Sequence, residues 1–192
     1  MSRLYIVRHG NTFDKGDVVL RVGRKTDLPL SSSGIEQAKA LNAHLADVKF
    51  DLAYSSDLKR TRQTIEIVMG HGNFIFSDAL TEIDYGPDEG KPESDVVKRL
   101  GQAAIDLWNE KSIPPEGWLV EAEQIRADWV QFLARLPRNK NIIVLTSNGT
   151  ARFLLDIVKN GQSAERKLRT GSYGVVNLSD TGPELESWNI RP

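Results

Sequence analysis

Short apolar runs alternate along this chain with segments of helical periodicity, and this alternation restricts the possible fold more than any other feature. The runs at 4–7 and 141–147 are rich in β-branched residues and are typical of buried strands. Shorter strands are predicted at 51–55, 172–178 and 185–190. Strands that alternate with helices usually lie parallel and are covered on both faces. The pattern therefore predicts an α/β protein, a three-layer α/β/α sandwich with a mostly parallel central sheet.

The predicted helices have recognisable start and stop signals. Ser33 followed three residues later by Glu36 resembles a capping box, in which two side chains satisfy free backbone N–H groups. Gly70 is a typical end for the next helix, because glycine readily adopts the left-handed conformation found there. The inner side of the first helix is expected to carry Ile35, Ala38, Leu41 and Leu45. Later helices are expected over 95–109, 119–136 and after Asn148, with an extended segment at 73–80 and a loop at 81–93.

The bulk composition limits the class of protein. A chain of 192 residues suits one domain spanning 1–192. A net charge of -1 argues against binding to nucleic acid or to a membrane surface, both of which favour strongly basic proteins. The absence of cysteine excludes disulfides, thiolate catalysis and Cys-ligated zinc. No apolar run approaches the ~20 residues that span a bilayer, and we see no signal segment, so we expect a cytoplasmic protein. The sequence makes no prediction of oligomeric state.

Three histidines are candidates for chemistry, and His9 has the most informative position. The triplet Arg8-His9-Gly10 directly follows the first predicted strand, and open α/β sheets bind ligands at the carboxyl ends of their strands. His44, expected near the middle of a helix, and His71, expected in a glycine-rich turn, are interpreted as solvated surface residues. From this segment alone, a structural role for His9 is an equal alternative.

Cations also follow the second predicted strand. Arg60 and Arg62 lie in the first turns of a helix after Tyr54-Ser55-Ser56, where hydroxyls and free backbone N–H groups favour an anion. A solvated helix start is the alternative interpretation. Together with Arg8 and His9 at another strand end, the pattern favours a single phosphate pocket.

An acidic loop is a candidate for a metal site or a proton donor. Its carboxylates belong to Glu82, Asp84, Asp88 and Glu89. They lack the spacing of a calcium loop, and without cysteine or a paired histidine motif no transition metal is expected. Taken alone, this loop is interpreted as solvated. The stretch 86–91 resembles a Walker phosphate loop, but it is one residue short and is followed by Pro92 instead of Ser or Thr, so we reject it.

Taken together, these segments resemble the histidine phosphatase superfamily, the phosphoglycerate mutase-like enzymes, over nearly the whole chain. The opening block is Arg-His-Gly-Asn-Thr at 8–12. Similar blocks follow in the family's order at 23–38, 54–64 and 80–90. Four ordered blocks with compatible spacing form a far more specific match than the initial tripeptide.

The resemblance implies a phosphate site that works without metal or cofactor. His9 matches the histidine that attacks phosphorus and becomes phosphorylated, and Glu82 matches the glutamate that protonates the leaving group. The expected phosphate contacts are Arg8, Arg60, the N–H of Asn11 and Thr12. These residue types suit the chemistry, because arginines keep an adjacent imidazole neutral and offer forked donors to phosphoryl oxygens.

One family feature is missing from the late block. Asn148 occupies the position where the family has a second histidine in its phosphate pocket. Asparagine keeps an N–H donor but cannot be cationic, so we expect a slowed or altered enzyme rather than an inactive one. Lys15, where many members have asparagine, is a candidate for restoring the positive charge. The family's Gly-Glu-Ser block has no clear match near 115–118.

Three functions are compatible with this resemblance. The first is a phosphomonoesterase that hydrolyses a small phosphorylated metabolite through a phosphohistidine on His9. The second, favoured by Asn148, is a catalytically impaired protein of the same fold that binds a phosphate ligand or a partner. The third is a mutase, which ranks last because the chain is short for a mutase of the family.

Overall fold

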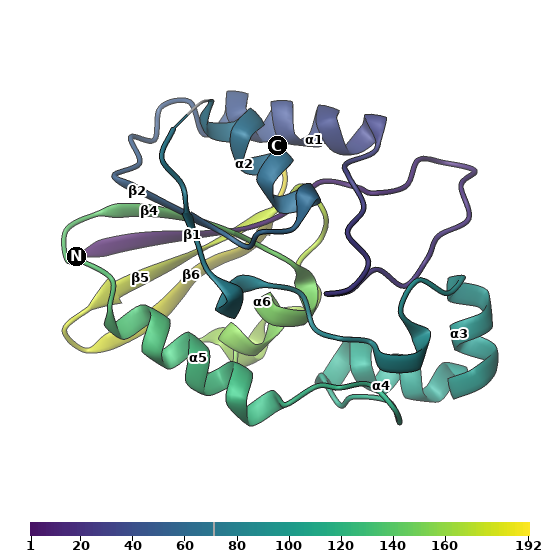
Figure 1. The fold of residues 1–192 in the computed structure, drawn as a ribbon. Helices are drawn as coiled ribbons and strands as arrows, with labels where there is room; N and C mark the ends of the chain where they lie inside the picture. The colour runs from purple at the N-terminus through teal and green to yellow at the C-terminus, as the bar shows by residue number, and fades with distance from the viewer. Residues whose placement is uncertain (71) are drawn as a thin grey trace.

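A six-stranded mixed sheet forms the centre of the computed structural model, which describes residues 1–70 and 72–192 (Figure 1). In spatial order the strands are β3 (Ile75–Phe76), β2 (Leu52–Ser55), β4 (Asn141–Thr146), β1 (Ser2–Arg8), β5 (Tyr173–Ser179) and β6 (Gly182–Ile190). The first four are parallel, and β5 and β6 add an antiparallel edge. The predicted strands are therefore confirmed, with small shifts at their ends.

Helices cover both faces of this sheet. They are α1 (Ser32–His44), α2 (Lys59–Met69), α3 (Glu93–Leu100), α4 (Gln102–Lys111), α5 (Ala122–Ala134) and α6 (Asn148–Leu154), with short 3-10 helices at Asp78–Leu80, Gly86–Asp88 and Gly161–Ser163. In Figure 1, α1 and α2 lie on one face, α5 and α6 lie on the other, and α3 and α4 lie beyond the end of the sheet. The predicted α/β/α sandwich with a mostly parallel sheet is confirmed.

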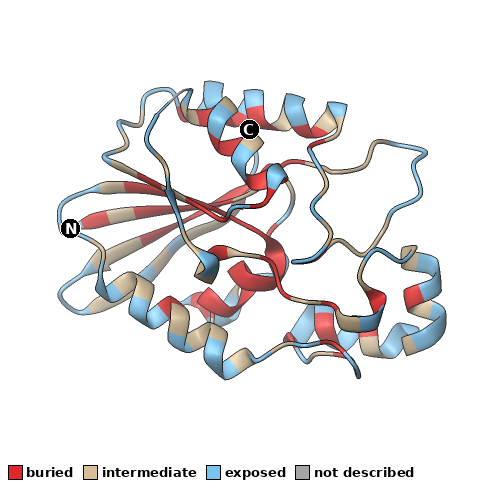
Figure 2. Ribbon diagram, in the orientation of Figure 1, coloured by how far each residue is buried: buried red, intermediate tan, exposed pale blue. Residues whose placement is uncertain are grey.

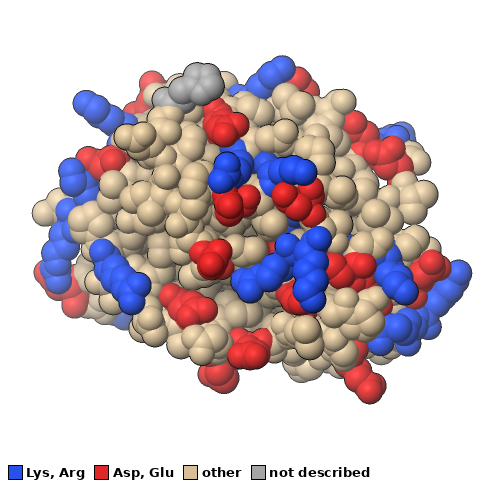
Figure 3. All heavy atoms as spheres, in the orientation of Figure 1, with Lys and Arg blue, Asp and Glu red and all other residues tan. Residues whose placement is uncertain are grey.

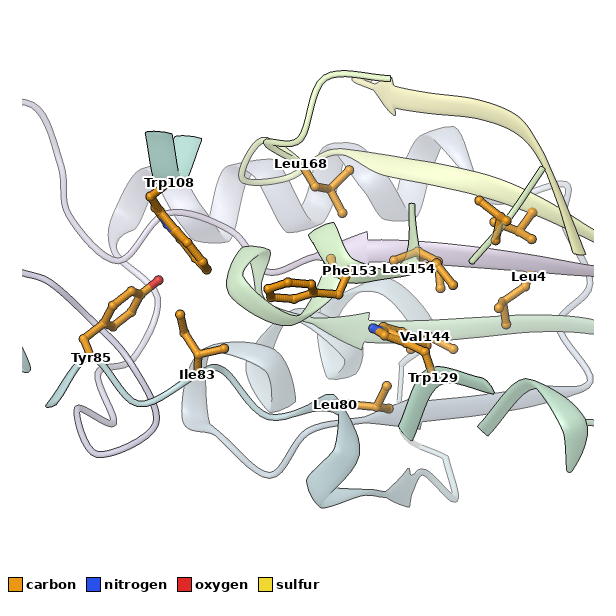
Figure 4. Packing of buried hydrophobic residues seen from close by; sticks show 14 of the residues in the cluster. Leu4, Leu80, Ile83, Tyr85, Trp108, Trp129, Val144, Phe153, Leu154 and Leu168 are labelled. Carbon is orange, nitrogen blue, oxygen red and sulfur yellow. The ribbon is translucent and has the colours of Figure 1, made fainter. Parts of the chain in front are cut away.

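The two faces arise from the alternation of side chains along the central strands. In β1, Leu4 and Ile6 belong to the core beneath α5 and α6, whereas Tyr5 and Val7 belong to the core beneath α1 and α2. Successive side chains of the two central strands, β1 and β4, are therefore buried over most of their length (Figure 2). Figure 4 shows the first of these cores, which extends from Leu4 past Phe153 to Trp108 at the end of the sheet.

Three helix predictions are corrected by the structure. The segment 95–109 holds two helices instead of one, because Gly101 breaks the chain direction with a φ of 81° that other residues rarely adopt. The first helix is capped by Ser31 rather than Ser33. The side-chain oxygen of Ser31 accepts a hydrogen bond from the N–H of Gly34. Ile35 on the same helix is exposed instead of facing the core. The helix after Asn148 ends at Leu154.

The surface carries both signs of charge. On the face drawn in Figure 3, the side chains of Lys and Arg are interspersed with those of Asp and Glu. Within the described residues, none of the helices combines the length and the apolar character that crossing a bilayer would require.

Candidate active site

A cavity of about 440 Å³ opens at the carboxyl ends of β1 and β4. These two strands are adjacent and parallel, with Arg8 opposite Thr146, so the residues that follow them meet at one edge of the sheet. Six of the seven predicted site residues line the cavity, namely Arg8, His9, Asn11, Thr12, Glu82 and Asn148. Arg60 is fully buried and is not among the lining residues, although its charge acts on His9.

His9 is buried and held in one tautomer. Its Nδ1 lies 2.7 Å from the carbonyl oxygen of Gly10, and because a carbonyl only accepts, Nδ1 must carry the proton. Nε2 therefore keeps its lone pair. Burial, followed by the charges of Arg60 and Arg8, holds the pKa of His9 well below its usual value. The structure thus has a neutral imidazole with a free nitrogen, the form in which histidine acts as a nucleophile.

Two guanidinium groups near His9 are held by backbone carbonyl groups. Arg8 donates from Nη1 to the carbonyl of Leu168 at 2.8 Å, and Arg60 donates to the carbonyls of Thr26 and Gly23 at 3.0 and 3.1 Å. The Nε atoms of both arginines are buried without a partner. Over residues 1–70 and 72–192, neither arginine lies within 4.0 Å of a carboxylate. Buried cations of this kind are suited to an anionic ligand.

Glu82 brings a carboxylate to the same cavity. Its side chain is almost fully buried, and Oε1 accepts from the N–H of Ile83 at 2.9 Å. The first turn of α6 lies against it so closely that a Cβ added at Gly149 would be 2.1 Å from Oε1. Gly149 therefore makes room for the carboxylate at a helix N-terminus, a role that the sequence reading did not assign.

Asn148 is fixed by a backbone contact. Its Oδ1 accepts from the N–H of Leu168 at 2.8 Å, while the carbonyl of Leu168 accepts from Arg8. With Oδ1 engaged in this way, the amide NH₂ group is the donor that Asn148 can offer to a ligand. The residue thus joins the cavity to the segment around Leu168.

The backbone N–H and the side chain of Asn11 are both hydrogen-bonded to other residues of the protein. Its N–H donates to Oε1 of Gln37 at 2.8 Å, and its side chain contacts Ser33 and Thr170. In this structure the N–H that was expected to contact phosphate is engaged by Gln37, so a phosphate contact through it stays a prediction. Thr12 lines the cavity, and its contact with phosphate stays a prediction.

Several residues of the cavity wall were not found by sequence reasoning. Tyr85 and Trp108 form an apolar side of the wall, and both lie near Ile83 in the same core cluster (Figure 4). Burial raises the pKa of Tyr85 above its usual range. Lys167 also lines the cavity, whereas Lys15, the predicted source of extra charge, is exposed and is not part of its wall. No local motif marks Lys167. It lies at the cavity because its neighbour Leu168 is hydrogen-bonded to Asn148 and Arg8, which are far away in the sequence.

The acidic loop is not solvated as expected. Asp88 is buried and accepts from Arg99 and from Nε1 of Trp118, the latter at 2.7 Å. Glu89 accepts from three backbone N–H groups, and Asp84 pairs with Lys25 at 2.7 Å. These carboxylates hold the loop in place. Among the described residues, no group of three or more His, Asp or Glu side chains is arranged to hold a metal ion.

Two other candidate residues, His44 and Arg62, lie away from the cavity. His44 is the last residue of α1 rather than a mid-helix residue, and it is exposed with Nε2 3.0 Å from the hydroxyl of Tyr173. Arg62 is exposed and pairs with Asp57. His71 lies outside the described residues.

Comparison with known proteins agrees with this geometry. The sequence matches the model of the histidine phosphatase superfamily (branch 1) over residues 4–191, and the chain belongs to this superfamily. It is 34% identical over 140 residues to fructose-2,6-bisphosphatase TIGAR of Mus musculus, covering 69% of this chain and 51% of that protein. The chain thus spans about half the length of that relative.

Two further matches extend over nearly the whole chain. The 2,3-bisphosphoglycerate-dependent phosphoglycerate mutase of Rhizobium meliloti is 31% identical over 191 residues, covering 92% of this chain and 90% of the mutase. The structure of the alpha-ribazole phosphatase from Shigella flexneri has a TM-score of 0.73 at 25% identity, covering 98% of this chain and 96% of that chain.

Proposed function

We propose that this protein is a metal-independent phosphomonoesterase that transfers the phosphoryl group of a small substrate to His9 and then to water. The observation that carries the proposal is the buried neutral imidazole of His9 beside two guanidinium groups that, among the described residues, have no carboxylate within 4.0 Å. Such a pocket is complementary to the negative charge that spreads over the phosphoryl oxygens during transfer.

The first half of the reaction forms a phosphohistidine. The lone pair on Nε2 of His9 attacks phosphorus, and the bond between phosphorus and the leaving oxygen breaks. Glu82 donates its proton to that oxygen, so the product leaves as an alcohol. Arg8 and Arg60 stabilise the phosphoryl charge throughout.

The second half returns the enzyme to its starting state. Glu82, now a carboxylate, takes a proton from water as the water oxygen attacks phosphorus. The bond between phosphorus and Nε2 breaks, and inorganic phosphate is released. His9 is again neutral and Glu82 is again protonated, so that no net change remains in the protein.

The amide of Asn148 supplies a neutral donor where the family has a histidine. Charge-assisted hydrogen bonds are about twice as strong as neutral ones, so this replacement slows transfer without removing the donor. The same residue favours the second candidate function, in which phosphate esters bind without turnover. A mutase is the third candidate, and the length of the chain does not argue against it, because the match to the Rhizobium meliloti mutase covers 90% of that protein.

The decisive experiment compares wild type with His9→Asn on p-nitrophenyl phosphate and on alkyl phosphates. Wild type should release phosphate and show an acid-labile phosphoryl label on His9, and the variant should show neither. Equal rates for the two proteins would overturn the phosphatase proposal. Binding of phosphate esters by wild type with no label and no turnover would support the binding function. Transfer of the label to a hydroxyl of a second substrate, in preference to water, would support the mutase.

A further inference from the structure

We propose that Arg152, buried behind Trp108, brings to the cavity beside His9 the positive charge that the neutral side chain of Asn148 does not supply. Arg152 acts through its electric field and does not touch the substrate. This inference rests on the proposed function, because the charge that Arg152 stabilises is that of a phosphoryl group beside His9. It gives a role to a buried arginine that takes no part in either half of the reaction.

Arg152 lies directly behind the wall of the cavity. It follows Asn148 by four residues on α6, so the two side chains lie on the same face of the helix. Side chains of a helix lean toward its N-terminus, which in α6 is the end at the cavity. The guanidinium carbon of Arg152 lies 4.0 Å from the centre of the Trp108 ring, and Nη1 donates to the carbonyl oxygen of Trp108. Because Trp108 itself lines the cavity, the guanidinium contacts the outer side of the cavity wall.

The charge of Arg152 is buried without a counter-ion. Its side chain is fully buried, and Nε and Nη2 have no hydrogen-bond partner among the described residues. Over residues 1–70 and 72–192, no carboxylate lies within 4.0 Å of it, and the nearby Asp156 pairs instead with Arg126 and Arg166. Such a cation is costly to keep, since an apolar side chain of similar volume is often at least as stable in its place. An anion bound in the cavity would offset this cost.

The field of Arg152 reaches groups that line the cavity. Burial lowers the pKa of Arg152 to about 10, so its guanidinium is still charged at neutral pH. The charges of Tyr85 and Glu82 raise this pKa, and the charge of Arg8 lowers it. All three residues line the cavity, so an anion placed among them also interacts with Arg152. Because Arg152 is buried, solvent and salt screen this interaction only weakly.

Asn148 and Arg152 divide two contributions that a protonated histidine would combine. The NH₂ group of Asn148 is a neutral hydrogen-bond donor at the cavity. Arg152 adds positive charge from behind the wall and occupies no space in the cavity. Lys15, the other candidate source of charge, is exposed and does not line the cavity. The charge of a phosphoryl group in transfer is therefore stabilised even though position 148 is neutral.

The first test compares Arg152→Gln, which removes the charge but keeps a donor for the carbonyl of Trp108, with Arg152→Lys, which keeps the charge. The probe is inorganic vanadate, and its dissociation constant is measured by calorimetric titration. Arg152→Gln should raise this constant about tenfold and lower kcat/KM for p-nitrophenyl phosphate by a similar factor, whereas Arg152→Lys should stay within about threefold of wild type. The control is Arg126→Gln, which removes an arginine paired with Asp156 on the neighbouring helix α5 and should leave both values unchanged. If Arg152→Gln does not fold, Arg152→Met takes its place.

The second test measures the field of Arg152 at position 148 directly. Asn148→His places a titratable imidazole there, and its pKa is followed by NMR in the wild-type, Arg152→Gln and Arg152→Lys backgrounds. Loss of a nearby positive charge favours the imidazolium, so we expect this pKa to be about one pH unit higher in Arg152→Gln than in the other two backgrounds. A role in packing alone would not give this dependence on charge.

The outcomes separate this inference from the proposed function. Equal vanadate binding in wild type and Arg152→Gln, with an unchanged pKa of the introduced imidazole, would overturn the inference and leave the phosphatase intact. Equal losses in Arg152→Gln and Arg152→Lys would show that Arg152 acts by packing, and would overturn it too. If wild type hydrolyses no phosphate ester, the phosphatase proposal fails, whereas vanadate binding and the pKa of the introduced imidazole still decide the inference.

Discussion

The candidate active site and the neighbouring acidic loop use arginine in opposite ways. In the pocket, Arg8 and Arg60 are held by carbonyl groups and have no carboxylate partner within the described residues. At the loop, Arg99 of α3 forms a bidentate pair with the buried carboxylate of Asp88. The difference shows which cations stabilise the fold and which remain available to a ligand, because a buried charge without a counter-ion is costly until an anion arrives.

The strongest test of this comparison is Arg60→Met. We expect kcat/KM to fall about 10³-fold, because the positive charge of Arg60, which acts on His9, no longer stabilises the developing phosphoryl charge. The free energy of unfolding should change by only ~1–2 kcal/mol, since relief of desolvation offsets the lost hydrogen bonds to Thr26 and Gly23. Inorganic phosphate should raise the Tm of wild type by linkage but not that of the variant. Nearly normal kcat/KM would contradict the assignment of Arg60 to the ligand.

A second large effect is expected from Gly149→Ala. The new Cβ would lie 2.1 Å from Oε1 of Glu82, so the carboxylate must move away from its position at the start of α6. We expect kcat to fall about 10²-fold for alkyl phosphates and much less for p-nitrophenyl phosphate, whose leaving group needs no proton. Glu82→Gln is the matched variant and should show the same dependence on the leaving group. If both substrates slow equally in Glu82→Gln, Glu82 is not the acid.

Local signals predicted the strands that carry the cavity, and the family resemblance selected most of the residues that line it. The residues after β1 and β4 belong to short runs with strong strand character, and adjacent parallel strands bring their carboxyl ends together. Arg60 was found in the same way, from its place at the start of a helix that follows β2. In these cases a few neighbouring residues determine the strand itself and place the residues that follow it at the edge of the sheet.

The rest of the site depends on contacts between residues that are far apart in the sequence. Lys167 reaches the cavity because Leu168, next to it, is held by Asn148 and Arg8. Lys15, which was the sequence-based choice for extra charge, lies in an exposed loop. The acidic loop was mispredicted for the same reason, because local sequence does not show contacts with other elements. Its charge and glycine content suggested a solvated loop, but Asp88 is paired with Arg99 on the following helix.

The link between Asn148 and the segment around Leu168 is tested by Asn148→Asp. The carboxylate can still accept from the N–H of Leu168, but it replaces the NH₂ donor with a negative oxygen. We therefore expect an intact fold and a rise in KM for phosphate esters of about tenfold or more. Asn148→His restores the family's residue, and a higher kcat would show that the neutral amide limits the rate. An unchanged KM in Asn148→Asp would show that the amide NH₂ does not face the substrate.

The pH dependence of stability tests whether His9 is held neutral. Its pKa is well below 6.5 in the folded protein, while the unfolded chain titrates near 6.5. Below that pH the unfolded chain binds more protons, so the free energy of unfolding should decrease on acidification by up to about 1.4 kcal/mol per pH unit. Urea denaturation from pH 7 to pH 5 should show this decrease in wild type but not in His9→Asn. Equal slopes for the two proteins would mean that His9 is not held neutral.

The smallest effect on catalysis, and the counterpart of Arg60→Met, is expected from Arg99→Met. Removing this arginine leaves the carboxylate of Asp88 buried with only Trp118 as a side-chain donor, so the free energy of unfolding should fall by ~1–2 kcal/mol. Because Arg99 is partly exposed and does not line the cavity, kcat/KM should remain within about twofold of wild type. Arg99 also lowers the pKa of Asp88 below 3.8, so the stability it provides is present at neutral pH and is lost as the pH falls through the lowered pKa. A large loss of kcat/KM with unchanged stability would place Arg99 among the ligand-binding cations and remove the distinction between the two regions.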